Sequence, residues 1–443
     1  MTYKISNLTG WGKYPVQSCK IVRPEQYEHL PIQSTTIARG QGRSYGDASL
    51  NAHGQVLLTE RLNKFIAFDK IKGTLTAEAG ITLAEILDII VPHGWFLPVV
   101  PGTKFVSLGG CIAADIHGKN HHHVGSFCQH VIGLDLINAN NETITCSPTK
   151  NADFFWATVG GMGLTGVIGN ATIKLTPITT AYLTVQHYPT DNLEQTFYYL
   201  NQPRCDDEYV VAWLDCLSGN SGRSIIMSAH HAKLEEILNP APLKITQRKS
   251  IKIPLNCPSW FLNKKALQKF NQFYYSLQAK KIEPFLIDYD KYFFQLDALI
   301  NWNRLYGKKG FIQYQCVLPP EQAFNGIKEI LAMIAKEAIP VFLAVLKRFG
   351  ETQQGLLSFP MAGYTVALDI PLQDNKLFQQ LDLLDEIVLK HAGRVYLAKD
   401  ARLSAENFRK MYPHYPQWLT QKNILDTDHV FSSSLSQRLK IGF

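Results

Sequence analysis

The chain has 443 residues, of which 46% are hydrophobic and 18% are charged, and this balance excludes a disordered protein. A chain of this length exceeds the usual size of one hydrophobic core, so we expect two domains. The formal net charge of +7, which we take to be spread along the chain, suits an anionic ligand or an acidic membrane surface but not a nucleic-acid-binding protein, because no basic run stands out.

The eight cysteines are irregularly spaced, with no C-x-x-C pair and no zinc pattern. The first residues lack the apolar core of a signal peptide, and no stretch has the length needed to span a bilayer. We therefore expect reduced cysteines and a cytoplasmic protein, and we leave open a peripheral contact with the inner face of the membrane. Cys128 and Cys316 are expected to be buried small hydrophobic residues.

The first 180 residues predict short strands with few helices. A short helix is expected around 25–30, and Thr82 is placed to cap a helix that ends at Pro92. The apolar face of that helix would consist of Leu83, Ile86, Leu87 and Ile90. Another short helix is expected at 153–159. Apolar alternation predicts strands at 36–39, 56–59, 65–69, 74–79, 131–138, 142–146 and 166–175, with a hairpin between 131–138 and 142–146.

Three glycine-rich segments lie among these elements, at 38–47, 101–126 and 160–166. The second contains five glycines, which is too many for a helix or an ordinary strand. Glycine adopts positive φ at little cost, and successive free N–H groups form concave sites for phosphate oxygens. Neither a Walker loop nor a dinucleotide fingerprint is present. The three loops together therefore predict one large phosphate-bearing ligand held at several points.

The character of the sequence changes near residue 181, where long glycine loops disappear and aromatic residues become frequent. Strands are expected at 210–215, 224–229, 311–317 and 364–370, and helices at 264–279, 323–336 and 375–391. The last fifty residues, with a polar helix at 405–411, are expected to return to the first domain. The predicted fold is α+β, with domains at 1–180 and 181–392 and a C-terminal return at 393–443.

A family resemblance is carried by three strings: ARGQGRSYGDASLN, PGTKFVSLGGCIAADIHGKNHHHVGSF and FFWATVGGMGLTGVI. They resemble the FAD-binding domain of the vanillyl-alcohol oxidase / p-cresol methylhydroxylase (PCMH) superfamily, which implies a PCMH-type fold that holds an extended FAD, followed by a substrate domain of β-sheet and helices. The narrower strings IHGKNHH, WNRLYG and YLAKDAR resemble, within that superfamily, the decaprenylphosphoryl-β-D-ribose 2'-oxidase family. The resemblance covers nearly the whole chain.

The resemblance implies an FAD site formed mainly by the first two glycine segments. The loop from Arg39 to Asp47 would surround the diphosphate and the ribityl chain, and Tyr396 would lie near the isoalloxazine ring. Residues 42–46 include no histidine or cysteine, so the FAD is expected to be non-covalent. The implied cofactor-binding residues are Arg39, Gly40, Gly42, Arg43, Ser44, Tyr45, Gly46, Asp47, Gly102, Ser107, Gly109, Gly110, Ala114, His117, Ile168 and Tyr396.

Lys399, together with Tyr396, is the implied catalytic residue. A lysine beside the flavin can hold the reacting hydroxyl and stabilise developing negative charge. Without its place in the YLAKDAR string, Lys399 would be taken for a solvated lysine at a strand end. The family carries a pocket cysteine where this chain has Ala367, so thiol-directed covalent inhibitors are expected to fail. The implied substrate-binding residues are Lys119, Gln313, Gln315, Lys347 and Trp213.

The reaction implied by the resemblance is oxidation of the 2'-hydroxyl of a polyprenyl-phosphoryl β-D-ribose to the 2'-keto sugar, with hydride transfer to flavin N5. This is the first half of an epimerisation to the arabinose, and it implies an NAD(P)H-dependent short-chain reductase as partner. Two alternatives stay open: a soluble sugar or alditol oxidase of the same superfamily, and a flavin- or sugar-lipid-binding subunit without turnover. The sequence does not fix the electron acceptor, the proton-abstracting base or the prenyl chain length.

Two further features of the sequence are a group of histidines and a short apolar segment. The histidines at 117 and 121–123 suggest a zinc site, but three adjacent histidines cannot all point at one ion and no cysteine or carboxylate completes the set, so we expect no metal. The apolar segment 260–262 is a candidate for contact with lipid near the substrate entrance.

Overall fold

The computed structural model describes residues 3–33, 35–202, 208–217, 222–237, 240–245, 248–258, 264–351, 354–374 and 376–442. Segment 260–262 lies outside these residues. In the described part of the chain, no helix combines the length and the apolar character that crossing a bilayer requires. The seven cysteines among the described residues are all unpaired, and Cys128 and Cys316 are buried, as predicted.

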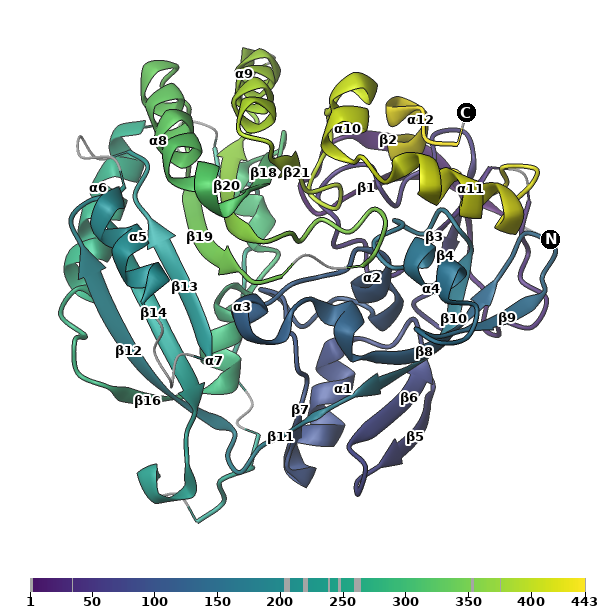
Figure 1. The fold of residues 1–443 in the computed structure, drawn as a ribbon, viewed down its shortest axis with the longest axis horizontal. Coiled ribbons are helices and arrows are strands. Elements are labelled where there is room, and N and C mark those ends of the chain that lie inside the picture. The colour runs from purple at the N-terminus through teal and green to yellow at the C-terminus, as the bar shows by residue number, and fades with distance from the viewer. Residues whose placement is uncertain are drawn as a thin grey trace.

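The N-terminal part is built on two sheets, seen at the right of Figure 1. The strands predicted before residue 180 are all present, each within one residue of its expected bounds. The first sheet has the order β1 (Lys4–Thr9), β2 (Val16–Val22), β4 (Gln55–Leu58) and β3 (Thr36–Arg39). The second has the order β5 (Phe65–Asp69), β6 (Thr74–Glu78), β10 (Val167–Lys174), β8 (Val131–Ile137) and β9 (Thr143–Cys146).

Helix α1 (Leu83–Ile90) begins and buries its side chains as predicted. The Thr82 hydroxyl accepts a hydrogen bond from the Glu85 N–H (3.2 Å), and the Glu85 carboxylate accepts one from the Thr82 N–H (2.8 Å). This capping box satisfies N–H groups that the first turn leaves free. Pro92 follows in a short 3₁₀ turn. The four predicted apolar residues are the buried ones: Leu83, Ile86, Leu87 and Ile90.

Two predictions for the N-terminal part were wrong. Residues 25–30 form turns and not a helix, because Pro24 and Pro31 leave only six residues between them, too few to offset the cost of helix nucleation. The second glycine segment, expected to exclude helix, contains α2 (Leu108–Ala113) and the single turn α3 (His121–Val124). Burial of apolar side chains on α2 outweighs the cost of its two glycines.

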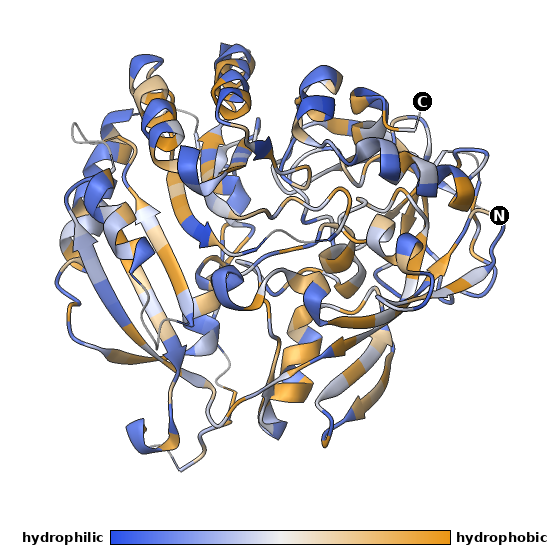
Figure 2. Cartoon of the chain, in the orientation of Figure 1, coloured by the Kyte–Doolittle hydropathy of each residue, from blue (hydrophilic) through white to orange (hydrophobic). Residues whose placement is uncertain are grey.

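An eight-stranded sheet forms the second part, and helices cover both of its faces (Figure 1). Helices α5 (Leu193–Asn201), α8 (Pro320–Lys336) and α9 (Lys376–Lys390) pack on one face, and α6 (Lys264–Gln278) packs on the other. Figure 2 shows that α8 and α9 each have a hydrophobic and a hydrophilic side. The strand order is β16 (Phe285–Asp288), β12 (Tyr182–Thr190), β14 (Ser224–His231), β13 (Tyr209–Leu214), β19 (Leu343–Phe349), β20 (Gly363–Pro371), β18 (Phe311–Leu318) and β21 (Arg394–Val395).

The register of the central strands separates apolar from polar side chains. Successive side chains in a strand point to opposite faces, and directly paired residues share a face. Tyr314 pairs with Leu368, and both are buried in the core beneath α8 and α9. The neighbouring pairs, Gln313 with Asp369 and Gln315 with Ala367, therefore lie on the opposite face. Lys347 of β19 pairs with Thr365 on this same face, which thus carries a polar row in the middle of a sheet.

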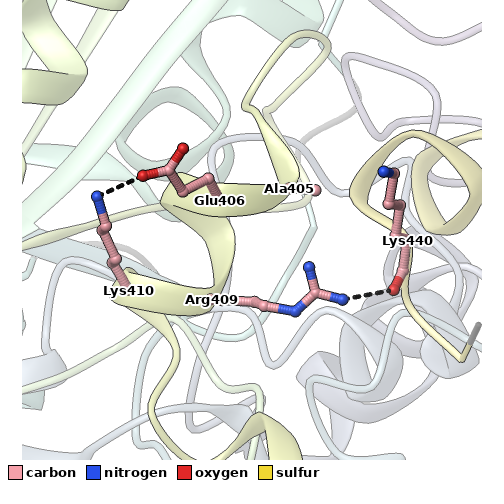
Figure 3. A pocket seen from close by; sticks show the side chains of 5 residues that line it. All are labelled: Ala405, Glu406, Arg409, Lys410 and Lys440. Atoms are coloured by element: carbon pink, nitrogen blue, oxygen red, sulfur yellow. Dashed lines mark hydrogen bonds and ion pairs between the residues drawn. The ribbon is translucent and has the colours of Figure 1, made fainter.

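The C-terminal helices α10 (Ala405–Met411), α11 (Tyr415–Leu425) and α12 (Ser434–Leu439) lie against the N-terminal part. The Thr36 N–H donates to the Val430 carbonyl (2.7 Å), and the Trp418 indole donates to the Ala157 carbonyl (2.8 Å). Between α10 and α12, a surface pocket is lined by Ala405, Glu406, Arg409, Lys410 and Lys440 (Figure 3). Lys410 in this pocket is paired with Glu406 at 2.7 Å.

Other short elements complete the described chain. They are β7 (Trp95–Phe96), β11 (Thr176–Pro177), β15 (Ile251–Lys252), β17 (Leu299–Ile300), α4 (Ala152–Thr158) and α7 (Tyr289–Phe293). The predicted helices of the second part, and the helix at 405–411, are all present.

Candidate active site

The first glycine loop, residues 40–47, leaves β3 as a concave turn of backbone. Gly42 has a φ of +62°, a left-handed conformation that favours glycine. A Cβ at Gly42 would overlap the guanidinium of Arg39, which lies behind the loop and donates to the Thr9 carbonyl at 2.8 Å. In the described part of the chain, the N–H groups of residues 41–44 have no hydrogen-bond acceptor. Four free N–H groups in one turn fit the oxygens of a diphosphate.

Ser107 and the start of α2 lie directly against this loop. A Cβ at Gly40 would overlap the Ser107 hydroxyl, so the two segments are in van der Waals contact. The Gly109 N–H already donates to the Ala79 carbonyl (2.7 Å), and the Gly110 N–H donates to the Ser107 hydroxyl (3.3 Å). We therefore expect these two glycines to permit close packing and not to present N–H groups to a ligand. Gly102 differs, because a Cβ there would meet no heavy atom within 4 Å.

The segment carrying Lys399 is fixed to the first glycine loop by backbone contacts. The Tyr45 N–H donates to the Ala398 carbonyl (3.0 Å), and a Cβ at Gly46 would overlap the Asp400 carbonyl oxygen. The Lys399 ammonium lies 3.9 Å from the centroid of the Tyr45 ring, which is a cation–π contact. The sequence motifs at 40–47 and 396–402, far apart in the chain, therefore form one site.

Asp47, predicted to contact the cofactor, uses its carboxylate inside the protein. Its two oxygens accept hydrogen bonds from Arg438 of α12, at 2.8 and 2.9 Å. Arg438 also pairs with Asp400 at 2.8 Å. Both carboxylates are buried, so this three-membered network fastens the end of the glycine loop to the C-terminal helix. Arg43 likewise has a partner in the chain, since its guanidinium lies 4.0 Å from the centre of the Trp11 ring.

His117 and Tyr396 lie together at the edge of the polar sheet face. Their ring centroids are 5.3 Å apart, and the Tyr396 hydroxyl donates to the Ala114 carbonyl (2.8 Å). The Gln315 amide nitrogen lies 2.9 Å from Nε2 of His117. Burial and the nearby charge of Lys347 lower the pKa of His117 well below its ordinary value, so the imidazole is neutral. Its buried Nδ1 has no partner among the described residues, which leaves a polar atom for a ligand.

Three lysines from three different elements converge on this face. Burial lowers the pKa of Lys347 to about 8, and burial together with the charge of Lys347 lowers the pKa of Lys119 to about 7. Burial lowers the pKa of Lys399 to about 7, although the carboxylate of Asp369 opposes this effect. All three side chains stay partly exposed. Lys119 donates to the Tyr292 carbonyl (2.7 Å). Three cations with one nearby carboxylate favour an anionic ligand.

Asp369 is the site residue that sequence reasoning missed. Gln313 donates to one carboxylate oxygen (2.5 Å), and the Tyr306 hydroxyl donates to the other (3.2 Å). Burial raises the pKa of Asp369 to about 6, while these hydrogen bonds and the charge of Lys399 oppose the rise. The signal was present in the sequence: Asp369 is an acidic residue inside the apolar strand TVALDIP, two positions after Ala367.

The comparisons with known proteins agree with this geometry. Residues 33–147 match the family model of an FAD-binding domain. The chain is 37% identical to decaprenylphosphoryl-β-D-ribose oxidase of Mycolicibacterium smegmatis, over 98% of this chain and 97% of that protein. The chain belongs to the decaprenylphosphoryl-β-D-ribose oxidase family. The predicted α+β fold, FAD cofactor and oxidoreductase class are therefore confirmed.

Two further relatives are less similar to this chain. A Streptomyces coelicolor protein, described as an uncharacterized protein in the mprA 5' region, is 30% identical over 81% of this chain and 100% of its own length. Mouse L-gulonolactone oxidase is 24% identical over 90% of this chain and 88% of its own length. The chain is an FAD-dependent oxidoreductase that acts on alcohol groups.

FAD fits the residues present in this oxidase. The free N–H groups of residues 41–44, the open space at Gly102 and the unpaired Nδ1 of His117 suit a diphosphate-bearing cofactor with a polar ring system. The residues proposed to hold it are the first glycine loop, Gly102, His117 and Tyr396. Their individual roles remain proposals.

Two of the predicted site residues of the oxidase, Trp213 and Ile168, do not lie beside the three lysines. Trp213 shares the polar sheet face but is 5% exposed, because Tyr274 of α6 covers it at 4.9 Å between ring centroids. Val345 and Ala367 separate it from Gln315 along the row of paired residues. Ile168 is buried in the core of the N-terminal part. Ala367 lies directly beside Gln315, so a residue at this position does border the site.

Denaturation is expected to release all of the flavin from this oxidase. The first glycine loop has no histidine or cysteine that a flavin can be attached to. Acid precipitation should therefore leave a colourless pellet and all of the flavin absorbance in the supernatant. A yellow pellet after repeated washing would show a covalent bond and overturn this prediction.

Proposed function

We propose that this oxidase converts the 2'-hydroxyl of a polyprenyl-phosphoryl β-D-ribose to the 2'-keto sugar. The convergence of Lys119, Lys347 and Lys399 beside His117 is the observation that supports it most directly, because a phosphodiester anion compensates their mutual repulsion. The substrate class is also the one in the name of the Mycolicibacterium smegmatis relative.

The roles of the side chains follow from their placement. Lys119 and Lys347 would bind the phosphodiester, and Gln315 would orient the sugar beside His117. Lys399 is the proposed base: a lysine whose pKa is about 7 is half neutral near neutral pH, and its amine can accept the proton of the reacting hydroxyl. The Asp369 carboxylate would stabilise the ammonium group so formed. Bound FAD would supply the hydride acceptor.

The keto product defines the kind of partner that must follow. An epimerisation requires a second hydride to be delivered to the opposite face of the keto carbon. We therefore propose an NAD(P)H-dependent short-chain reductase as the partner. Two things support this proposal. One is the chemistry of the keto product, which must be reduced again to complete an epimerisation, and the other is the family resemblance of this chain.

Isotopic labelling tests the proposed position of oxidation. A short-chain prenylphosphoryl ribose with deuterium at C2' should reduce the flavin more slowly than the unlabelled compound, under anaerobic conditions. The product should be a keto sugar that has lost the deuterium. A keto product that retains the label would show that another carbon is oxidised, and would contradict the proposal.

The pH dependence should separate the base from the phosphate-binding lysines. Because Lys399 must be neutral to accept a proton, kcat should rise with pH through about 7 and then level off. Lys119 and Lys347 must stay charged to bind the phosphodiester, so KM should increase as the pH rises through about 7 to 8, where these two lysines lose their charge. Asp369→Asn removes the negative charge that raises the pKa of Lys399, and should move the rise in kcat to lower pH. An unshifted profile in this variant would contradict the assigned pairing.

A further inference from the structure

The positive charge of the chain is concentrated in one segment, contrary to the expectation that it is spread out. Residues 244–286 contain nine basic residues and one acidic residue, Glu283, so they carry a net charge of +8, and the rest of the chain is close to neutral. All nine side chains are exposed. They are Lys244, Arg248, Lys249, Lys252, Lys264, Lys265, Lys269, Lys280 and Lys281.

Exposed apolar side chains lie among these cations. Phe270, Phe273 and Leu277 are spaced along one side of α6, at positions i, i+3 and i+7. Phe273 is 67% exposed, and Leu255 nearby in sequence is 77% exposed. Among the described residues of this segment, the exposed large hydrophobic ones are Ile251, Leu255, Phe270, Phe273, Leu277, Ile282 and Leu286. We call those of the cations and hydrophobic residues that lie on α6 or directly follow it the α6 surface, namely Lys264, Lys265, Lys269, Phe270, Phe273, Leu277, Lys280, Lys281 and Ile282.

Hydrogen bonds hold α6 in place, and its cations are not neutralised by carboxylates in the part of the chain that the structure describes. Asn271, on the inner side of α6, donates to the buried Asp215 (2.8 Å), and Gln268 donates to the Leu217 carbonyl (2.9 Å). Among the described residues, none of the nine cations forms an ion pair with a carboxylate. The surface therefore exposes to solvent both cations without a carboxylate partner in the described ranges and aromatic and aliphatic side chains.

A short chain of aromatic contacts joins this surface to the site. The Phe270 ring stacks on Phe342, with centroids 6.1 Å apart and an interplanar angle of 15°. Phe342 contacts Tyr306 at 5.2 Å between centroids, and the Tyr306 hydroxyl donates to Asp369. Two side chains, Phe342 and Tyr306, thus connect the exposed Phe270 with the carboxylate beside Lys399.

We propose that the α6 surface docks on an anionic lipid membrane. An amphipathic helix with an aromatic stripe beside lysines lies in the interface of such a membrane, with its apolar side chains among the acyl chains and its lysines near the head groups. Charge complementarity selects anionic lipid as the occupant. The consequence for substrate access rests on the proposed function: docking would let the prenyl chain stay in the bilayer while the sugar reaches Lys399.

Vesicle flotation of the FAD-loaded full-length protein tests the proposal. It should float with vesicles of phosphatidylcholine and phosphatidylglycerol, and much less with phosphatidylcholine alone. Lys264→Gln/Lys265→Gln/Lys269→Gln should lower the partition constant on the order of 100-fold, since each lysine near an anionic surface contributes about 1 kcal/mol. Phe273→Ser/Leu277→Ser should lower it at least about tenfold.

Matched controls remove the same kinds of side chain elsewhere. Ile71→Ser/Tyr198→Ser changes two exposed hydrophobic residues, and Lys4→Gln/Lys70→Gln/Lys336→Gln changes three exposed lysines. Both controls should float like the wild type. Two results would overturn the proposal. One is equal flotation of the α6 variants and the controls. The other is a wild-type protein that does not float with vesicles but binds an acidic protein through these residues.

Activity separates this proposal from the proposed function. With a water-soluble short-chain prenylphosphoryl ribose, the α6 variants should reduce flavin at the wild-type rate. With a long-chain substrate in anionic vesicles, they should be slower in proportion to their lost binding. Absence of turnover with either substrate would contradict the proposed function and leave the flotation result standing. Equal rates for variants and wild type on vesicles would contradict a role for docking in substrate access.

Discussion

Replacing Lys399 with methionine is expected to slow flavin reduction by about 10²–10³-fold or more, while FAD remains bound. Methionine keeps the length of the side chain but can neither accept a proton nor carry a charge. The cofactor should stay, because the contact between this segment and the glycine loop uses backbone atoms, namely the Ala398 carbonyl and the Tyr45 N–H. Anaerobic stopped-flow absorbance gives the rate, and the visible spectrum gives the FAD content.

Lys347→Met is the matched control for Lys399→Met. Both substitutions remove one cation from the same cluster, but only Lys399 lies over Tyr45 of the glycine loop. Lys347→Met should therefore raise KM for the anionic substrate and leave the limiting rate of reduction nearly unchanged at a pH well above 7, where Lys399 is neutral in both proteins. Wild-type reduction by Lys399→Met, or equal loss of the limiting rate in both variants, would refute the assignment of Lys399 as the base.

Arg438→Leu is expected to lower the free energy of unfolding by about 3–5 kcal/mol and to reduce the FAD content. The substitution leaves Asp47 and Asp400 buried, close together and without their shared cation. Asp47 ends the glycine loop, so this repulsion acts directly on the segment proposed to bind the diphosphate. Denaturant unfolding followed by circular dichroism measures the stability, and the absorbance of the purified protein measures bound FAD.

The pH dependence of the Arg438→Leu defect has a defined sign. In the wild type, Arg438 holds down the pKa values of both carboxylates, opposing the rise that burial causes. Without it these pKa values rise, so the carboxylates take up protons at moderately low pH and their repulsion is relieved. The deficit relative to wild type should therefore be larger at pH 8 than at pH 5. Arg409→Leu, at an exposed position of α10, should change stability by no more than about 0.5 kcal/mol. A deficit that is equally small in both variants would contradict the account.

Local patterns in the sequence were sufficient for much of the fold. The capped helix at Thr82 and seven strands of the first 180 residues depend on neighbours along the chain, and these strands were placed within one residue, whereas β1, β2, β7 and β11 were missed. Strand β19 was missed, although it carries Lys347, because apolar and polar residues alternate poorly in its sequence LAVLKRF. Its place is set by pairing with β13 and β20, which local sequence does not show.

The site shows the same division between local and distant causes. The glycine loops and the YLAKDAR string were recognised because their residues are contiguous. The partner of Asp47 was not, since Arg438 lies 391 residues away in the chain. Asp369 was missed for the same reason: its neighbours Gln313, Tyr306 and Lys399 belong to separate elements. The cations of the α6 surface were overlooked because apolar and polar residues interrupt them, so they form no continuous basic run.

The most direct test of the central claim is anaerobic stopped-flow absorbance of the FAD-loaded protein with two kinds of substrate. One is a short-chain prenylphosphoryl ribose, and the other is a set of free alditols. If the lysine cluster binds the phosphodiester and places the ribose beside Lys399, only the lipid-linked ribose will bleach the flavin band. Bleaching by free alditols at a comparable rate would identify a soluble sugar oxidase, and bleaching by neither would favour a binding subunit. Either result would contradict the account.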